Sequence, residues 1–171
     1  QGHVADDDVR QVRRRERMTR WLLIFLKYPT PGKVKTRLAK TLGARAACEA
    51  YRTCVETTLD RVAGLHRETQ LWVDPPDAMA RTRRWLGRRW AYRPQRGRGL
   101  GARLRHATSR AFTEGAHRVV VIGTDSPWIS EREIKQAFAA LQEHDLVIGP
   151  SRDGGYYLIG LASPTPCLFE G

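Results

Sequence analysis

Residues 118–127 read RVVVIGTDSP, and this stretch decides the fold class. Four β-branched apolar residues follow Arg118, which is typical of a buried parallel strand. Gly123 and the polar residues after it end the run in a turn. The same sequence of short apolar run and polar turn recurs along the chain, with helical periodicity between the runs. The pattern therefore predicts an α/β domain with a mainly parallel sheet covered on both faces.

The other elements follow from the same two periodicities. Strands are expected at residues 21–27 (WLLIFLK), 69–73, 90–93, 118–122, 145–148 and 156–161. Helices are expected over residues 35–42, 44–62, 77–86, 100–114 and 130–141. Asp77 is predicted to cap the third helix, and Ser130 with Glu133 to form a capping box at the last. Together they predict one domain over residues 21–171, preceded by a charged tail at residues 1–20.

The net charge of +12 is unevenly spread over the 171 residues. Twelve arginines lie between Arg81 and Arg118 against one acid, whereas residues 119–171 carry three basic and seven acidic groups. Clustered arginines are one feature of nucleic-acid-binding proteins. However, arginine outnumbers lysine 25 to 5 in the whole chain, which indicates a compositional bias. We therefore expect no nucleic-acid partner, and keep a non-catalytic nucleic-acid-binding protein as an alternative.

Apolar runs and cysteines indicate the compartment. The longest apolar run, residues 21–26, is far shorter than the roughly 20 residues that a membrane helix needs. No apolar leader segment is visible at the N-terminus. Cys48, Cys54 and Cys167 form no CxxC pair, so we expect reduced thiols. The expected protein is cytoplasmic and has no membrane partner.

Open α/β sheets bind ligands beyond the carboxyl ends of their strands, and polar loops follow several strands here. The first loop, residues 28–37 (YPTPGKVKTR), brings Lys33, Lys35 and Arg37 to the start of a helix. Backbone N–H groups and the helix dipole favour an anion there, and the side chains add charge for a phosphate. The alternative is a solvated basic helix turn, since the loop is neither a Walker A nor a GxGxxG motif.

Two later loops carry aspartates. Asp125 follows a strand directly and is a natural hard ligand for Mg²⁺ or Mn²⁺ bridging to phosphates, although a turn or cap role is the alternative. In residues 149–155 (GPSRDGG), Asp153 is a candidate second metal ligand. Gly154 and Gly155 would let the backbone approach a ligand closely. A simple hairpin turn is the alternative interpretation of this loop.

A glycine-rich segment, QRGRGLGAR, begins at Gln95 and leads into a helix. The Gln95 amide is able to hydrogen-bond a base edge. We expect Gln95, Gly99, Leu100 and Gly101 to contact a nucleotide. An ordinary strand–helix connection is the alternative.

Four segments in this order, FLKYPTPGKVKTRLAKTLG, QRGRGLGARLRHA, VVVIGTDSP and DLVIGPSRDGGYYLIGL, resemble an uncharacterised bacterial family of glycosyltransferase-like proteins. That family belongs to the glycosyltransferase-A superfamily of nucleotide-diphospho-sugar transferases. The resemblance implies a three-layer α/β/α fold, a divalent metal at Asp125, and phosphate binding by Lys33, Lys35 and Arg37. The acceptor side is then expected near Asp153, Gly154, Gly155 and Tyr156.

Two features depart from the family pattern. The family often reads GDLG, with an acid where this chain has Gly99, so a role of that acid does not carry over. The GRGLGARL and VKTRL segments resemble instead the related phospholactate guanylyltransferases, which lack DGGYYLIG. The family usually continues well past LFEG, so we expect a domain that lacks the family's last strands and helix.

The resemblance implies an enzyme that transfers a sugar from a nucleotide sugar to a small acceptor. The metal, Lys35 and Arg37 would stabilise the departing diphosphate. Asp153 is the candidate base. The alternative is nucleotidyl transfer, in which a phosphorylated substrate attacks the α-phosphate of a nucleoside triphosphate and pyrophosphate leaves. The sequence identifies neither the donor base, nor the acceptor, nor an oligomeric state.

Overall fold

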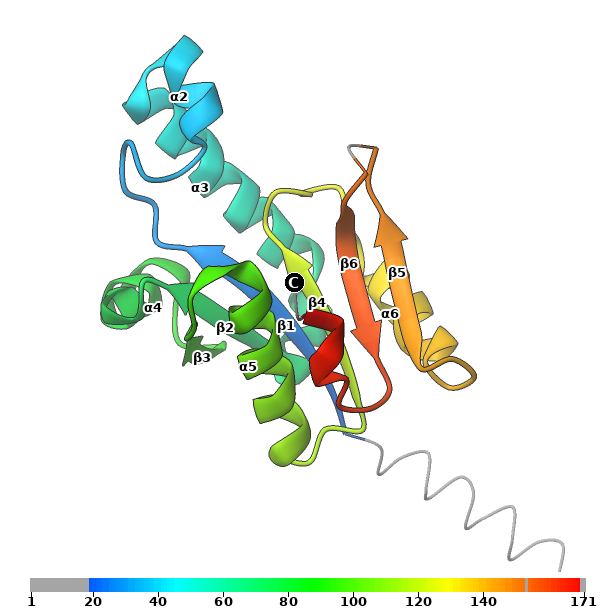
Figure 1. Ribbon diagram of the computed structural model, residues 1–171. Helices are drawn as coiled ribbons and strands as arrows, with labels where there is room; N and C mark the ends of the chain where they lie inside the picture. The colour runs from blue at the N-terminus through cyan, green and yellow to red at the C-terminus, as the bar shows by residue number, and fades with distance from the viewer. Residues whose placement is uncertain (1–18, 153, 170–171) are drawn as a thin grey trace, which may run out of the picture.

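One six-stranded sheet organises the molecule (Figure 1). The computed structural model describes residues 19–152 and 154–169. The strand order is β3-β2-β1-β4-β6-β5. The strands are β1 (Arg20–Lys27), β2 (Thr69–Asp74), β3 (Ala91–Pro94), β4 (Arg118–Gly123), β5 (Leu146–Pro150) and β6 (Tyr156–Leu161).

Most neighbouring strands are parallel, which confirms the predicted sheet type. β1 pairs parallel with β2 and β4, and β2 pairs parallel with β3. β6 runs antiparallel to both β4 and β5. This reversal arises because a short loop, rather than a crossover helix, joins β5 to β6.

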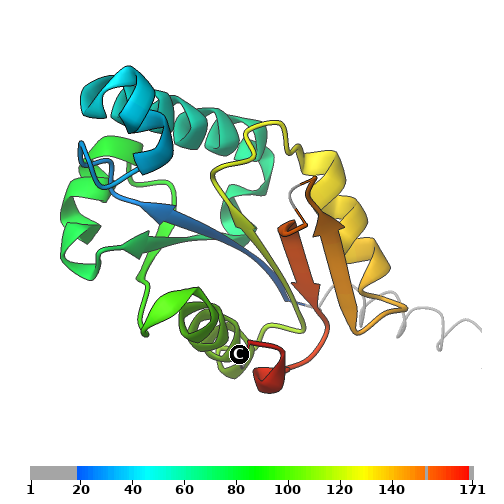
Figure 2. The ribbon, with the colours of Figure 1, turned by 45° about the horizontal axis from the view of Figure 1, so that its top comes forward.

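Helices cover both faces of the sheet, which confirms the three-layer α/β/α architecture (Figure 2). One face carries α3 (Ala44–Arg61), α4 (Met79–Leu86) and α6 (Glu131–Ala140), with α2 (Thr36–Leu42) packed on α3. The other face carries α5 (Gly99–Thr113) and the 3₁₀ turn η3 (Pro166–Phe169). Two further 3₁₀ turns, η1 (Ala63–Glu68) and η2 (Pro76–Ala78), flank β2.

Alternate side chains of β1 enter different cores. Leu22, Ile24 and Leu26 pack on the α3 face, whereas Leu23 and Phe25 pack on the α5 face. Each of the five is at most 9% exposed. A strand buried on both faces has no polar side to show, so it forms one continuous apolar run in the sequence.

The register of the parallel strands brings their polar ends to one edge. Lys27 at the end of β1 lies opposite Asp74 at the end of β2. Phe25 lies opposite Gly123, the last residue of β4. Gln95 follows β3, and its N–H continues the pairing by donating to β2 at 2.9 Å. The carboxyl edge, where the sequence predicts the site, therefore gathers the ends of four strands.

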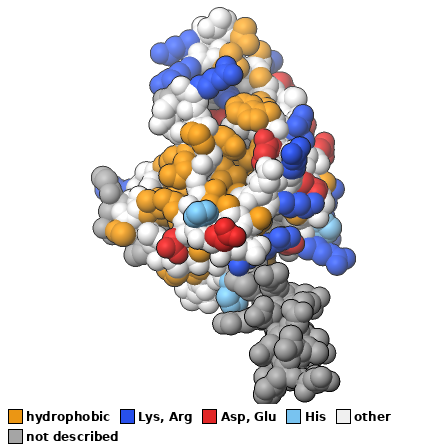
Figure 3. Space-filling model, turned by 90° about the vertical axis from the view of Figure 1, so that its right-hand side faces the viewer, with side chains coloured by type: hydrophobic (Ala, Val, Ile, Leu, Met, Phe, Trp, Pro, Cys, Tyr) orange, Lys and Arg blue, Asp and Glu red, His pale blue; other side chains and the backbone are white. Residues whose placement is uncertain are grey.

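β5 is the outermost strand on one side of the sheet, and β3 is the outermost strand on the other. Leu146 and Ile148 are 39% and 51% exposed in this strand of the β5 side. Val147 between them packs against the core on the face that α3, α4 and α6 cover. Figure 3 faces this side of the molecule and shows hydrophobic side chains gathered on it, with Lys and Arg side chains above and to the right of them and acidic side chains below.

Several predicted boundaries and caps differ from the structure. Arg20 belongs to β1 rather than to the tail, because it lies opposite Arg118 in the β1–β4 ladder, and its side chain forms an ion pair with Glu68 at 2.6 Å. Residues 1–18 of the expected tail lie outside the described residues. Asp77 does not cap α4: the N-cap is Ala78, which makes no side-chain cap hydrogen bond, and Asp77 lies within the preceding 3₁₀ turn.

The predicted capping box at α6 is confirmed. The Ser130 N–H donates to a carboxylate oxygen of Glu133 at 2.6 Å, and Ser130 is the N-cap of the helix. Within the part of the chain that the structure describes, no helix has the length and apolar character needed to cross a bilayer.

Candidate active site

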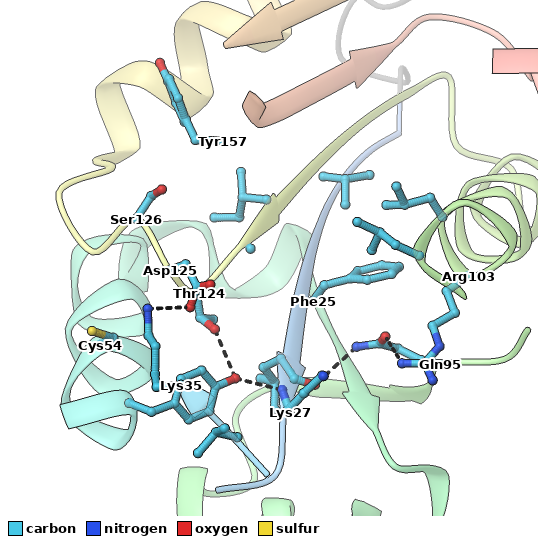
Figure 4. A pocket seen from close by; sticks show the side chains of 18 of the residues that line it. Phe25, Lys27, Lys35, Cys54, Gln95, Arg103, Thr124, Asp125, Ser126 and Tyr157 are labelled. Atoms are coloured by element: carbon cyan, nitrogen blue, oxygen red, sulfur yellow. Dashed lines mark hydrogen bonds and ion pairs between the residues drawn. The ribbon is translucent and has the colours of Figure 1, made fainter. Parts of the chain in front are cut away.

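A cleft of about 1210 Å³ opens along the carboxyl edge of the sheet (Figure 4). Its floor includes Phe25, Val121 and Ile159, and its charged lining residues are Lys27, Lys33, Lys35, Arg37, Arg103 and Asp125. The lining comes from β1, the loop before α2, α2 itself, the middle of α3, the first turns of α5, the end of β4 with the loop after it, and the start of β6. Ligand pockets are typically about 300–1,000 Å³. The cleft is therefore larger than a typical single-ligand pocket.

The structure brings the three predicted phosphate ligands, Lys33, Lys35 and Arg37, to this cleft. Lys35 is the N-cap of α2 and has the left-handed backbone conformation, with φ 47° and ψ 45°. Its Nζ atom lies 2.9 Å from Oδ1 of Asp125. Because α2 has just seven residues, the side-chain charges rather than a helix dipole supply most of the positive potential.

Asp125 presents an exposed carboxylate to the cleft. Its side chain is 74% exposed, whereas the preceding Thr124 is 3% exposed. The cap interpretation of Asp125 does not hold for α6, because Ser130 occupies that position. Across residues 19–152 and 154–169, no group of three His, Cys, Asp or Glu side chains is placed to hold a metal ion. A lone carboxylate suits a hard cation that takes its other ligands from phosphate oxygens and water.

A buried tyrosine links the two strand ends nearest to Asp125. Tyr51 of α3 is 5% exposed. Its hydroxyl accepts the Lys27 N–H at 2.8 Å and lies 3.2 Å from Oγ1 of Thr124, and either hydroxyl can donate in that pair. Burial raises the pKa of the Tyr51 phenol, so it stays protonated at neutral pH. Sequence reasoning missed this residue; the signal was a residue with a polar tip on the apolar face of a helix.

The predicted base reader, Gln95, is 5% exposed and is engaged by the protein. Its Nε2 donates to the carbonyls of Leu26 at 3.1 Å and Trp72 at 2.8 Å. Its Oε1 accepts from Arg103 at 3.4 Å, and Arg103 forms an ion pair with Asp74 at 2.9 Å. The predicted contact with a base stays a prediction, and the amide oxygen is the atom with a lone pair left for it. Asp74 and Arg103 were not singled out from the sequence.

The glycine-rich segment contributes only part of its length to the cleft. Gly99 and Leu100 line it, and Leu100 is 62% exposed. Gly101 is not among the lining residues: a Cβ there would lie 2.8 Å from the carbonyl oxygen of Phe169. Close packing of α5 on η3 therefore accounts for the glycine at position 101.

The GPSRDGG segment forms the hairpin between β5 and β6. The Gly154 N–H donates to the Ser151 carbonyl at 3.2 Å, and the Ser151 N–H donates to the Gly155 carbonyl at 2.9 Å. Gly154 has φ 85°, which suits glycine in this turn. Tyr156, directly after the turn, lines the cleft, whereas neither glycine does. Asp153 lies outside the described residues.

The arginines of the basic stretch are divided between the two faces of the molecule. On the α4 face, Arg83 lies over the Tyr92 ring at 5.3 Å. On the α5 face, Arg110 pairs with Glu114 at 2.7 Å, and this hydrogen bond lowers the pKa of the Glu114 carboxyl. These arginines therefore make contacts within the protein, and their charges lie on both faces of the molecule rather than in one patch.

The model of the family described as "Uncharacterized protein conserved in bacteria (DUF2064)" matches residues 58–171. The chain belongs to this family. The DUF2064 chain is also 33% identical over 138 residues to the phosphoenolpyruvate guanylyltransferase of Sphaerobacter thermophilus. That match covers 76% of this chain and 63% of the relative, so the chain spans less than two thirds of that relative's length. The family resemblance predicted from the sequence is thereby confirmed.

Solved structures agree with the fold of this DUF2064 chain. A protein of Desulfovibrio desulfuricans G20, described as a nucleotide-diphospho-sugar transferase, has a TM-score of 0.85 at 40% identity over 90% of this chain and 68% of its own. A cytidylyltransferase of Leptospira borgpetersenii has a TM-score of 0.56 at 15% identity, over 90% of this chain and 63% of its own, and shows the fold alone. The two relatives above 30% identity both carry transferase names.

Proposed function

We propose that this chain binds a nucleoside triphosphate and transfers its nucleotidyl group to a small anionic acceptor. The charge balance of the cleft carries the proposal. Lys27, Lys33, Lys35 and Arg37 line it together with a single exposed carboxylate, Asp125. A triphosphate with an anionic acceptor brings more negative charge than the diphosphate of a nucleotide sugar, and it matches this cationic excess better.

The relative with a named reaction supports the same reaction class. It is called a guanylyltransferase, which is a nucleotidyl-transferring enzyme, and its match covers 76% of this chain. We extend the class of reaction, nucleotidyl transfer, to this chain and leave the base and the acceptor to experiment.

In the proposed reaction an acceptor oxygen attacks the α-phosphorus. The bond from that phosphorus to the bridging oxygen breaks, and pyrophosphate leaves with the electron pair. Lys35 and Arg37 donate charge-assisted hydrogen bonds to phosphate oxygens and stabilise the charge that develops on the departing group. Lys33 adds positive potential at the mouth of the same loop. The acceptor lies toward the β5–β6 hairpin, where Tyr156 lines the cleft.

The residues present fit a divalent cation that arrives with the nucleotide. Asp125 would hold Mg²⁺ or Mn²⁺ together with phosphate oxygens, because one carboxylate alone is a weak ligand set for a hard cation. The cation, when bound, would neutralise phosphate charge and polarise the phosphorus–oxygen bonds. Asp153, the acidic residue of the GPSRDGG segment, is the proposed base for an acceptor that attacks through a hydroxyl group, whereas an ionised phosphate oxygen needs none.

Glycosyl transfer from a nucleotide sugar is the second candidate. The structure at 40% identity is described as a nucleotide-diphospho-sugar transferase, and the cleft volume accommodates a sugar beside a nucleotide. The same cations would then stabilise a departing nucleoside diphosphate.

Product analysis separates the two reactions. The protein is incubated with Mn²⁺ and each common nucleoside triphosphate plus a panel of small phosphorylated acids, and pyrophosphate release is measured. A parallel series uses nucleotide sugars and measures nucleoside diphosphate release. Pyrophosphate release that requires an acceptor and is lost in Asp125→Asn supports nucleotidyl transfer. Acceptor-dependent diphosphate release in place of pyrophosphate release would replace the first candidate by the second.

A further inference from the structure

We infer that Tyr51 is a positioning residue for the proposed reaction: its hydroxyl fixes the loop that carries Asp125 against the end of β1. The inference rests on the proposed function for what Asp125 does, and on the geometry for how Asp125 is held. Tyr51 lies on α3, on a different element from every charged residue assigned to the phosphates or the metal.

The ladder between β1 and β4 ends two residues before β1 does. Pairing between these strands stops at Phe25 and Gly123, while β1 continues to Lys27. Because backbone N–H groups at i and i+2 of a strand point to the same side, the Lys27 N–H points past the last residue of β4. The Tyr51 hydroxyl accepts the hydrogen bond from this N–H at 2.8 Å. It takes the place of the backbone carbonyl that a longer β4 would have offered.

The Tyr51 hydroxyl also contacts the residue that follows β4. The same hydroxyl lies 3.2 Å from Oγ1 of Thr124, the residue between the end of β4 and Asp125. Tyr51 is 5% exposed and Thr124 is 3% exposed, so water does not compete freely for the two hydroxyls. In Figure 4 the dashed lines that leave Lys27 and Thr124 lie below the dashed line between Lys35 and Asp125.

The Asp125 carboxylate has little to hold it apart from its own backbone. This carboxylate is 74% exposed and pairs with the flexible ammonium of Lys35. The position of this carboxylate is therefore set largely by the backbone of its loop, whose near end is held at Thr124. The far end has its own anchors, from Arg61 to the Trp128 carbonyl at 3.1 Å and from the Ile129 N–H to the Ser126 carbonyl at 3.2 Å. Removing the Tyr51 hydroxyl releases the near end alone.

The protein offers a matched control for removal of a buried phenol hydroxyl. Tyr92 is 7% exposed, and its hydroxyl donates to the Gly87 carbonyl at 2.6 Å, away from the cleft lining. Tyr51→Phe and Tyr92→Phe each delete one oxygen from a buried tyrosine. A loss seen in Tyr51→Phe and absent in Tyr92→Phe is a loss of positioning rather than of general stability.

The experiment combines two readouts on wild type, Tyr51→Phe, Thr124→Val and Tyr92→Phe. Amide hydrogen exchange is followed in residues 123–129, and the affinity for GTP, ATP, CTP and UTP is measured by calorimetry with and without Mn²⁺. We expect Tyr51→Phe and Thr124→Val to speed exchange in residues 123–129 and to weaken Mn²⁺-dependent affinity about fivefold to tenfold, as for one lost hydrogen bond. The double variant, Tyr51→Phe with Thr124→Val, should bind nucleotide with Mn²⁺ no more weakly than the weaker of the two single variants.

Each other outcome overturns a defined statement. Unchanged exchange and unchanged Mn²⁺-dependent affinity in Tyr51→Phe would refute the inference while leaving the proposed function intact. Equal losses in Tyr92→Phe would refute it as well, because they would show a general stability effect. If wild type binds no nucleotide under any condition, the proposed function falls first, and the inference about Tyr51 falls with it.

Discussion

The Nζ atom of Lys35 lies 2.9 Å from Oδ1 of Asp125, so the proposed phosphate ligand and the proposed metal ligand pair with each other across the cleft. A nucleotide bound as proposed with its cation would separate them, since the phosphate would take the ammonium and the cation the carboxylate. Metal and nucleotide should therefore bind with mutual dependence. Ion pairs this exposed contribute about 0.2–1 kcal/mol, so the pair opens readily.

The pairing predicts opposite effects of Lys35→Ala on two ligands. Mn²⁺ alone should bind up to about fivefold more tightly, because the carboxylate loses a competing cation worth about 1 kcal/mol at most. Nucleotide affinity should fall, because a phosphate ligand is lost. Electron paramagnetic resonance titration of free Mn²⁺, with and without nucleotide, measures both. Weaker binding of Mn²⁺ alone in the variant would contradict the mutual masking.

Asp125→Asn should abolish the Mn²⁺-dependent part of nucleotide binding without unfolding the protein. The change is nearly isosteric but replaces a charged oxygen ligand by a neutral one. In wild type, nucleotide at about 100 times its dissociation constant should add about 2.7 kcal/mol to stability in the presence of Mn²⁺. Thermal shift with Mn²⁺ or chelator checks this, with the exposed Asp77, outside the cleft lining, changed to Asn as the control. A full Mn²⁺ response in Asp125→Asn would remove the metal role.

Charge in the cleft should matter far more than charge elsewhere. Lys35→Ala with Arg37→Ala should weaken nucleotide binding roughly a hundredfold or more, since each charge-assisted hydrogen bond contributes about 1.5–3 kcal/mol. The exposed Arg84 and Arg88, changed together to Ala, form the control because neither lines the cleft. Salt screens such remote charges over about 8–10 Å. Equal losses in both double variants would point to the basic field as a whole, and a steep salt dependence on nucleic acid would then follow.

Gln95→Leu should destabilise the domain and test base reading at once. The variant removes the two side-chain hydrogen bonds to the carbonyls of Leu26 and Trp72, at about 0.5–1.5 kcal/mol for each. Chemical denaturation measures this, with exposed Gln136→Leu as the control. If Gln95 reads a base, the variant also flattens the preference among the four triphosphates. An unchanged preference assigns the residue to holding strands β1 and β2 in place.

Tyr92 makes the stability depend on pH in the alkaline range. Burial raises the pKa of this phenol to about 12. Because the folded pKa lies above the unfolded value of about 10, the contribution is fully present below pH 10 and is lost as the pH rises toward 12. Across that window wild type should lose about 1.4 kcal/mol per pH unit relative to Tyr92→Phe. Parallel slopes for the two proteins in urea unfolding series would contradict the assignment.

Local patterns predicted the fold because the deciding features are local. The apolar run over residues 21–27 appears as a strand buried on both faces, and Ser130 with Glu133 forms the predicted box because the two residues lie three positions apart on one helix turn. Asp77 failed as a cap for a local reason too: a 3₁₀ turn at Pro76–Ala78 precedes the helix and moves the N-cap to Ala78.

The parts of the site that were not predicted depend on contacts between distant segments. Tyr51 bonds to Thr124 across 73 positions of the chain, and Asp74 pairs with Arg103 from another element. A pattern of polar residues after strands identifies the ends of strands, but not the helix side chain that reaches between two of them. The locking of the Gln95 amide by Leu26 and Trp72 likewise follows from strand order, which periodicity does not supply.

The antiparallel direction of β6 makes one part of the cleft wall unusually replaceable. In a sheet of parallel strands each loop at the ligand edge must lead into a crossover helix, and its length is constrained by helix packing. The β5–β6 connection returns within the same sheet, so its length and composition are free of any helix. Grafting hairpins of different lengths between Pro150 and Tyr156 should alter the acceptors admitted while the nucleotide end of the cleft stays as it is. The hairpin turn is therefore the position in this fold where directed evolution should change acceptor preference without disturbing a helix.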